Sequence, residues 1–378
     1  MIYADHAATT KISETAKLAM LSAMEKDWYN PSSLYTPGQQ ASGTLMDARV
    51  RIAHCLGCLP KEIYFTSGGS EADNQAILSA AAIGKRQGKM HIISTAFEHH
   101  AVLHTLKKLE KEGFEITLLD VGEKGIVSPV QVEKAIRPET ILVTVMYANN
   151  EIGTIQPIRE IGAICRKNGV LFHTDAVQAA GHLQINVEKD QIDMLSLSAH
   201  KFNGPKGIGV LYAKTGVFLT NLIEGGGQER GKRAGTENLP AIVGMVAALE
   251  EACSLQKERS IYVTKLRDQL IDGLKKIPGA LLNGDATNRL PGNVNFCFPD
   301  TEAEGLLLLL DNKGICASSG SACTSGFLDP SHVLLAIGRD PQTARGSLRL
   351  TLDYENTPEE VETIIEAVTD TVRILRGC

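Results

Sequence analysis

The chain has 378 residues, of which 43% are hydrophobic and 22% are charged, and it carries a net charge of −6 at pH 7. A chain of this length and composition can bury a large core in one or two domains. The slight acidic excess argues against a general nucleic-acid-binding protein, which would usually present a basic face.

The residues at the start, Met1 to Asp5, show no charged segment followed by an apolar run, so we expect no signal peptide. The longest aliphatic run, Leu306 to Leu310, is far too short for a membrane span. Eight scattered cysteines without a secretion signal indicate reduced thiols. Cys55 and Cys58 have metal-ligand spacing, but no second such pair follows, so we expect no metal site. These features together predict a cytoplasmic protein with no membrane partner.

Short apolar runs that predict strands alternate with helical patterns through the first two thirds of the chain. Between Ile155 and Asn168, for example, apolar residues recur at helical spacing. Such alternation predicts an α/β fold with a mostly parallel sheet and helices on both faces, and ligands bind beyond the carboxyl ends of such strands. The predicted strands are residues 63–66, 91–94, 116–119, 141–147, 170–174, 194–198 and 208–212.

The pattern changes after about residue 260. Strands are predicted at 293–298, 314–317 and 347–352, and a helix is predicted near 302–312. Thr357, Pro358 and Glu360 have the spacing of a capping box that begins a last helix. We therefore predict a large domain over residues 13–258 and a smaller α+β domain formed by residues 1–12 and 259–378.

A lysine and an aspartate each end a predicted strand. Lys201 follows small and apolar residues, and partial desolvation would lower its pKa and make it a better nucleophile, although a lysine in this position is usually solvated. Asp175 ends a second apolar strand and needs a cationic partner. That partner is either a nearby Lys or Arg or the protonated pyridine nitrogen of pyridoxal phosphate. Gln178 would lie close by, within reach of the cofactor's phenolic oxygen.

A loop of small residues, Thr66 to Ala72, lies between a predicted strand and a predicted helix. Small residues let the backbone approach a phosphate, and the helix N-terminus supplies free N–H groups and a positive dipole. The alternative is a plain glycine turn with a serine cap. The loop matches neither the dinucleotide-binding fingerprint nor a P-loop.

Three further residues have two readings each. His99 follows a strand and is either a core histidine or a catalytic one. Arg349, inside an apolar strand, needs an anion, which is either a substrate carboxylate or an internal carboxylate. Cys323 lies in a loop of very small residues and is either a reactive thiol or an incidental exposed one. Cys316, on the preceding apolar run, is expected to be packed in the core.

Four of these segments occur together and in a fixed order. They are NNEIG at 149–153, TDAVQ at 174–178, SLSAHK at 196–201 and SSGSAC at 318–323. In this combination the chain closely resembles, over nearly its whole length, the cysteine desulfurases of the class V aminotransferase family, which have the type I pyridoxal-phosphate fold. The resemblance implies removal of sulfur from L-cysteine, giving L-alanine and a persulfide on Cys323. That sulfur would pass to an acceptor or scaffold protein in iron–sulfur cluster assembly or thiolation.

The resemblance also implies a role for each matching residue. Lys201 would hold the cofactor, Cys323 would accept the sulfur, and His99 would stack on the cofactor ring and move protons. Thr236 would be lent to the site by the second subunit of a homodimer. Substrate contacts would come from Asn30, Asn150 and Arg349. The residues implied to bind pyridoxal phosphate are Gly69, Ser70, His99, Asn150, Asp175, Gln178, Ser198, His200, Lys201 and Thr236.

Two positions depart from the commoner family pattern. His6 stands where many members have Asn or Tyr, and Gly69-Ser70 stands where Ala-Thr is frequent. Neither change removes a needed chemical group. A selenocysteine lyase or an aminotransferase on the same fold is the alternative enzyme. An inactive scaffold that binds sulfur-transfer partners is the alternative outside the enzymes.

Overall fold

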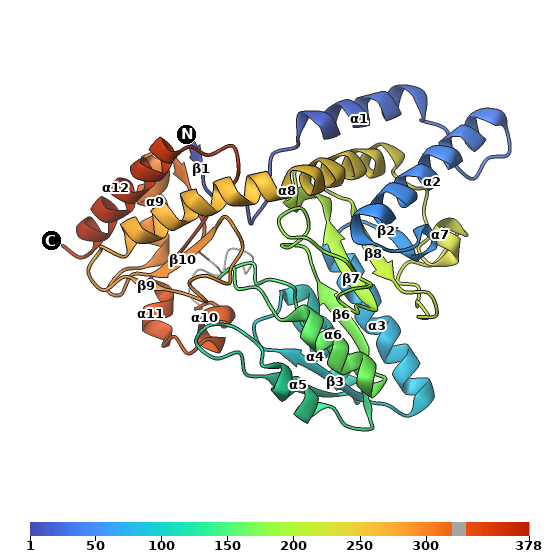
Figure 1. Ribbon diagram of the computed structural model, residues 1–378, viewed down its shortest axis with the longest axis horizontal. Coiled ribbons are helices and arrows are strands. Elements are labelled where there is room, and N and C mark those ends of the chain that lie inside the picture. The colour runs from blue at the N-terminus through green and yellow to red at the C-terminus, as the bar shows by residue number, and fades with distance from the viewer. Residues whose placement is uncertain (320–329, 378) are drawn as a thin grey trace.

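The computed structural model describes residues 1–319 and 330–377 and places a seven-stranded sheet in the larger part of the molecule (Figure 1). Neighbouring strands pair in parallel except at β8, which is antiparallel to both of its neighbours. The predicted α/β class with a mostly parallel sheet is confirmed. The spatial order is β2 (Ile63–Thr66), β8 (Gly209–Ala213), β7 (Met194–Ser198), β6 (Leu171–Asp175), β5 (Thr140–Thr144), β3 (His91–Thr95) and β4 (Glu115–Leu119).

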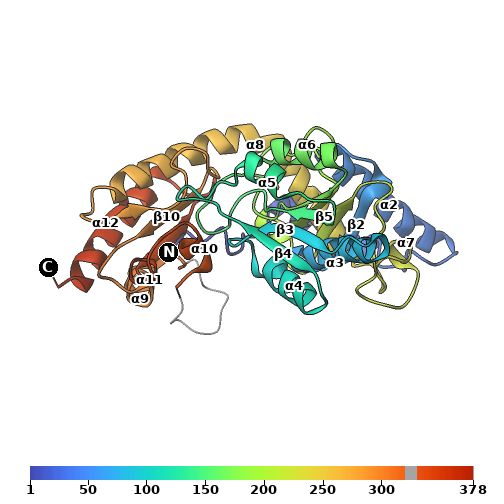
Figure 2. The same cartoon turned by 90° about the horizontal axis from the view of Figure 1, so that it is seen from below.

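Helices cover both faces of this sheet, as Figure 2 shows. Helices α3 (Gly69–Gln87) and α4 (His100–Lys111) lie on one face, and α5 (Pro129–Ala135) and α6 (Ile158–Asn168) lie on the other. Helix α6 buries the apolar stripe that the sequence predicts and ends where Gly169 takes a left-handed conformation with φ of 63°. Helices α1 (Glu14–Lys26) and α2 (Thr36–Leu56) pack beside the long helix α8 (Leu239–Leu274), and α7 (Gln228–Gly231) is a short turn before it.

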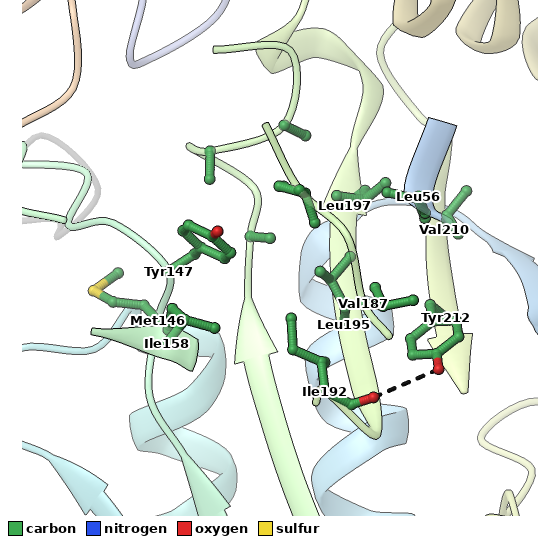
Figure 3. Close-up of a cluster of buried hydrophobic side chains, with 14 of the residues drawn as sticks. Leu56, Met146, Tyr147, Ile158, Val187, Ile192, Leu195, Leu197, Val210 and Tyr212 are labelled. Atoms are coloured by element: carbon green, nitrogen blue, oxygen red, sulfur yellow. Dashed lines mark hydrogen bonds between the residues drawn. The ribbon is translucent and has the colours of Figure 1, made fainter. Parts of the chain in front are cut away.

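The core of this part forms where side chains from the sheet meet the covering helices. Leu195, Leu197 and Val210 from β7 and β8 gather with Leu56 from the end of α2 (Figure 3). All four side chains are buried, so this contact fixes the position of β7, the strand that precedes Lys201.

A second core surrounds a three-stranded antiparallel sheet with the order β12-β10-β9. A short parallel pair, β1 with β11, brings the N-terminus beside this sheet. Helix α12 begins with the capping box of Thr357 and Glu360 that the sequence predicts. The elements here are β1 (Ile2–Tyr3), β9 (Leu281–Leu282), β10 (Asn293–Cys297), α9 (Ala303–Asn312), β11 (Ile315–Cys316), α10 (His332–Ala336), α11 (Pro341–Arg345), β12 (Ser347–Thr351) and α12 (Pro358–Leu375).

Helix α8 runs without a break through the predicted domain boundary at residues 258 and 259. Its first half supplies Ala252 to the larger core, and its second half supplies Val263 to the smaller one. By length and composition alone α8 could span a membrane, but 56% of its most apolar window is buried inside the protein. The stated domain limits stay a prediction.

Two expected elements differ from the structure in length. The strand predicted at 141–147 ends at Thr144, where its regular pairing with β6 stops opposite His173, although the Tyr147 N–H still donates to the Asp175 carbonyl at 2.7 Å. The strand predicted at 314–317 is reduced to two residues, and Cys316 is only half-buried rather than packed in the core.

Gly209 tests the close packing of β8 against the loop before α3. A Cβ atom at Gly209 would lie 2.4 Å from the Leu197 carbonyl oxygen and 2.7 Å from the Gly68 Cα. We predict that Gly209→Ala lowers the free energy of unfolding by roughly 1–3 kcal/mol, because backbone atoms must move to make room. The measurement is urea denaturation of the cofactor-free protein.

The matched control is Gly43→Ala in α2, where a Cβ would meet open space. Alanine in a helix interior should stabilise the protein by roughly 0.5–1 kcal/mol. Equal stabilities of the two variants would contradict the close approach at Gly209.

Candidate active site

A cavity of about 310 Å³ lies at the carboxyl ends of β5, β6 and β7. Parallel strands end at the same edge of a sheet, so the residues that follow them meet there. Residues of the N-terminal segment and of the smaller part close the cavity from the other side. Ten of the residues predicted for the site line it: Gly69, Ser70, His99, Asn150, Asp175, Gln178, Ser198, His200, Lys201 and Arg349.

Asp175 is the last residue of β6 and is only 6% exposed. Its Oδ1 accepts a hydrogen bond from the Val177 N–H at 2.9 Å. Burial raises the pKa of Asp175, while His99, the Val177 N–H and Lys201 act in the opposite direction. The carboxyl group is therefore placed where an added cation would ionise it fully.

Lys201 lies on the short 3₁₀ turn Ala199–Lys201, directly after β7. Its Nζ donates to the carbonyl oxygens of Ala7 at 2.6 Å and Ala8 at 2.7 Å. The Gln178 side chain also donates to the Ala7 oxygen, at 3.0 Å. The N-terminal segment is therefore a wall of the cavity, held there by two residues from different strand ends.

His99 is the N-cap residue of α4, and its Nδ1 accepts a hydrogen bond from the Ala101 N–H at 3.2 Å. Because Nδ1 is an acceptor, the neutral ring carries its proton on Nε2. Burial, and after it the neighbouring Lys201, lower the pKa of His99, although Asp175 opposes this. His99 is therefore a neutral imidazole beside Asp175.

The N-terminus of α3 faces the cavity through Gly69 and Ser70. No side chain caps this 19-residue helix, so the N–H groups of its first turn are open to a ligand. A Cβ at Gly69 would lie 2.6 Å from the Val177 Cγ2, so glycine provides the space here. Together with Ser198 and His200, which also line the cavity, these groups fit an anion such as a phosphate.

Arg349 lies in the middle of β12 and is 5% exposed. One guanidinium nitrogen pairs with Asp5 at 2.9 Å, and the other donates to the Asn150 carbonyl at 3.1 Å. Its Nε has no hydrogen-bond partner among the described residues. The internal salt bridge is thus present, and part of the guanidinium still faces the cavity. Ser318 exchanges backbone hydrogen bonds of 3.2 and 2.6 Å with Arg349, so the chain reaches the cavity edge just before residue 320.

Two other predicted site residues, Asn30 and Thr236, are not part of this lining. Asn30 is exposed, and its Oδ1 accepts a hydrogen bond from the Ser32 N–H at 2.9 Å. Thr236 lines a separate hollow of about 60 Å³. Cys323 lies outside the described residues.

Sequence reasoning missed several lining residues. Asp73 lies on α3 one helical turn after Gly69, and this spacing alone could have placed it on the cavity side. His100, Glu151 and His332 also line the cavity. His332 lies on α10, and its Nε2 donates to the Glu98 carbonyl at 2.9 Å. This contact joins segments that are far apart in the sequence, so no local sequence pattern predicts it.

Comparisons with known proteins agree over the full chain. The aminotransferase class-V family model matches residues 2–364. The cysteine desulfurase IscS of Methanosarcina thermophila is 52% identical, over 100% of this chain and 93% of that protein. The putative cysteine desulfurase IscS 1 of Bacillus subtilis is 46% identical, over 99% of both. A solved NifS-like protein has a TM-score of 0.92 and 36% identity over 99% of both chains. The structure of SspA in complex with cysteine has a TM-score of 0.81 and 36% identity, over 93% of this chain and 99% of that chain.

The fold, the cavity at the strand ends and the full-length match define an α/β enzyme, and the chain belongs to the class-V aminotransferase family. Within that family it is a cysteine desulfurase, similar over its whole length to the IscS proteins. The family expected from the sequence motifs is confirmed.

The half-buried imidazole of His200 makes the protein sensitive to acid. Burial, with Lys201 and Lys206 nearby, lowers the pKa of His200 to about 4, whereas an unfolded histidine has a pKa of about 6.5. Between these values the unfolded chain binds a proton that the folded chain does not. We predict that stability falls as the pH drops from about 6.5 to about 4, and that His200→Gln reduces this dependence.

Urea midpoints of the cofactor-free protein across this pH range check the prediction. His54→Gln, at an exposed position on α2, is the control and should keep the wild-type pH dependence. An unchanged pH dependence in His200→Gln would contradict the assignment.

Proposed function

We propose that the chain uses pyridoxal phosphate to remove sulfur from L-cysteine, leaving L-alanine and a persulfide on Cys323. The observation that carries this proposal is that Lys201 and Asp175 share one cavity with the open N-terminus of α3. A nucleophilic amine, a buried carboxyl and an anion site are the three groups that this cofactor requires.

The residues present fit the cofactor group by group. Asp175 would pair with the pyridine nitrogen and keep it protonated, and Gln178 would reach the phenolic oxygen. Gly69, Ser70, Ser198 and His200 would hold the phosphate at the start of α3. When bound, the cofactor supplies a sink for the electrons left on the substrate carbon after a proton is removed.

Lys201 is suited to hold the cofactor and then to move a proton. Its Nζ donates to the carbonyl oxygens of Ala7 and Ala8, which hold the amine at the wall of the cavity. When free, the amine would act as the base at the substrate Cα. His99 would contact the cofactor, and its Nε2 proton could then be passed to the substrate.

Arg349 would orient the substrate through its carboxylate. The guanidinium now pairs with Asp5, so the substrate carboxylate must share it with Asp5 or displace that side chain. Asn150 would provide a second contact, since its carbonyl already binds the same guanidinium. Asn30 would contribute near the substrate only if its exposed segment moves or comes from a partner subunit.

The sulfur step needs one more nucleophile, which we assign to Cys323. Its thiolate attacks the substrate sulfur, a new S–S bond forms, and the electron pair of the broken C–S bond returns to the substrate carbon. That carbon takes up a proton, and the skeleton leaves as alanine. The persulfide is then available to an acceptor or scaffold protein for iron–sulfur cluster assembly or thiolation.

We further propose a cytoplasmic homodimer without nucleic-acid or membrane partners. Exposed apolar side chains gather on α1 and the segment after it, at Leu18, Leu21, Met24 and Trp28. Single exposed apolar residues are common, but a row of them at helical spacing is typical of an interface. Thr236 lies outside the cavity of its own chain, as expected of a residue lent to a partner's cofactor phosphate.

Lys201→Ala tests the proposed function directly. We expect release of alanine and sulfide from L-cysteine to fall by about 10²–10⁴-fold or more, because the base at the substrate Cα is lost. The variant should also lose the link that borohydride fixes between cofactor and protein, as mass spectrometry would show. Lys167→Ala, on the exposed surface of α6, is the control and should behave as the wild type. A cofactor still fixed by borohydride in Lys201→Ala would show that another lysine holds it.

The two nearby cysteines allow a second test. We predict that Cys323→Ser binds cofactor and L-cysteine but releases no sulfur, because the acceptor thiol is gone. Cys316→Ala, in the half-buried β11, should stay active. Mass spectrometry after addition of L-cysteine should find one extra sulfur on the peptide that contains Cys323. Finding it on Cys316, Cys55, Cys58 or Cys378 instead would mean that the wrong thiol has been assigned.

A further inference from the structure

A second buried carboxyl group lies beside Asp175. Asp73, on α3, is 1% exposed and lines the same cavity. Asp73, His99 and Asp175 each place a donor atom within 4.8 Å of the others. One oxygen of Asp73, Oδ1, has no hydrogen-bond partner among the described residues. The proposed function gives Asp175 a role but leaves Asp73 without one.

Asp73 belongs to a hydrogen-bonded chain of buried polar side chains that leads from the cavity into the sheet. It is hydrogen-bonded to the Ser196 hydroxyl, and the Ser196 Oγ lies 3.0 Å from the His173 Nε2. The His173 Nδ1 lies 2.8 Å from the Thr144 Oγ1. The side chains of these four residues are all buried. These hydrogen bonds are continuous from the cavity to Thr144, the last residue of β5.

Two histidines lie near Asp73 among the described residues. The His173 Nε2 lies 3.6 Å from Oδ1, and a ring nitrogen of His99, whose pKa burial also lowers, lies within 4.8 Å of an Asp73 oxygen. Burial lowers the pKa of His173 to about 3, so this ring is neutral. Burial first, and then the neighbouring Asp175 and Glu98, raise the pKa of Asp73 well above its ordinary value. A charged Asp73 would therefore be a buried ion without a partner.

The surroundings of the two carboxyl groups are unequal. Asp175 receives the Val177 N–H and faces Lys201 and His99, all of which favour its ionised form. Asp73 receives the Ser196 hydroxyl and faces a neutral histidine. Two carboxylates so close in a dry site repel each other strongly, and one of them therefore keeps a proton. The proton shared by the pair belongs on Asp73.

We propose that Asp73 is a positioning residue that stays a neutral carboxylic acid, held by Ser196, and so leaves Asp175 as the single ionised carboxylate that would pair with the pyridine nitrogen of the cofactor. This inference rests on the proposed use of pyridoxal phosphate. A neutral Asp73 adds no second negative charge at the ring nitrogen, so the charge there is set by Asp175 alone. The Ser196 hydroxyl donates to Asp73, and the contacts through His173 to Thr144 hold that hydroxyl in place.

Infrared difference spectroscopy of the cofactor-loaded enzyme tests the protonation state. We expect the wild type to show the carbonyl band of a protonated carboxylic acid at neutral pH, and Asp73→Asn to lose that band. Glu98→Gln is the matched control, since Glu98 is another fully buried acid whose pKa burial raises, to about 8, but it does not line the cavity. It should remove a different band and leave that of Asp73 in place. Loss of a carboxylate band in Asp73→Asn would show that Asp73 is ionised and overturn the proposal.

A pH titration of the cofactor's visible absorption gives a second readout that a merely structural role would not move. If Asp73 is neutral, Asp73→Asn replaces one uncharged group with another, and the midpoint should move by less than about 0.3 pH units. Removing a real charge at this distance should move it by about 1 unit or more, which would also overturn the proposal. Carboxyl carbon NMR of the wild type labelled at aspartate covers the case in which the variant does not fold. One aspartate signal should stay at its protonated position across neutral pH, and its absence would count against Asp73.

The infrared, absorption and NMR measurements do not depend on sulfur release. A protein that binds the cofactor but yields no alanine would refute the proposed function and leave the result for Asp73 standing. A protein that desulfurises cysteine with an ionised Asp73 would do the reverse.

Discussion

The arrangement of this site follows from the free-energy cost of burying the carboxyl group of Asp175. Asp175 sits at the end of β6 in an almost dry position, and such a group needs hydrogen bonds and a cation nearby. Among the described residues, the Val177 N–H donates a hydrogen bond to the Asp175 carboxyl group, and the rest of this group faces the cavity. Lys201 approaches from the end of β7, which neighbours β6, and His99 approaches from the start of α4. An added cation in the cavity would therefore favour the ionised form of Asp175.

The N-terminal segment, residues 5–8, connects the two parts of the site. Ala7 and Ala8 accept hydrogen bonds from Lys201, and Ala7 also accepts one from Gln178. Two residues earlier, Asp5 holds the guanidinium of Arg349 on β12. A few consecutive residues therefore join the lysine of the larger part to the arginine of the smaller part. If a ligand displaces the contact of Lys201 or that of Arg349, the short backbone segment between them should shift and change the other contact.

Much of the site could be predicted because its residues follow strand ends. Once alternating apolar runs indicate a parallel sheet, the residues after each run are expected at one edge, and Lys201, Asp175 and His99 lie there. Asp73 and the carbonyls of Ala7 and Ala8 could not be placed in this way. From the sequence alone, an aspartate in a helix is expected to face solvent. A backbone carbonyl group is present in every residue, so the sequence does not single it out. Asn30 and Thr236 lie outside the cavity, because a short motif does not give the distance between segments that are far apart in the sequence.

Helix α8 has a consequence for how the protein unfolds. Leu249 and Ala252 from its first half belong to the core under the seven-stranded sheet, and Leu266 and Leu270 from its second half belong to the core around the three-stranded one. A helix draws most of its stability from the partners that its apolar face buries, and it frays when half of them are lost. The smaller core therefore cannot melt while the larger one stays intact and α8 stays whole. Two separate cores that share one continuous helix should lose their structure in a single cooperative transition.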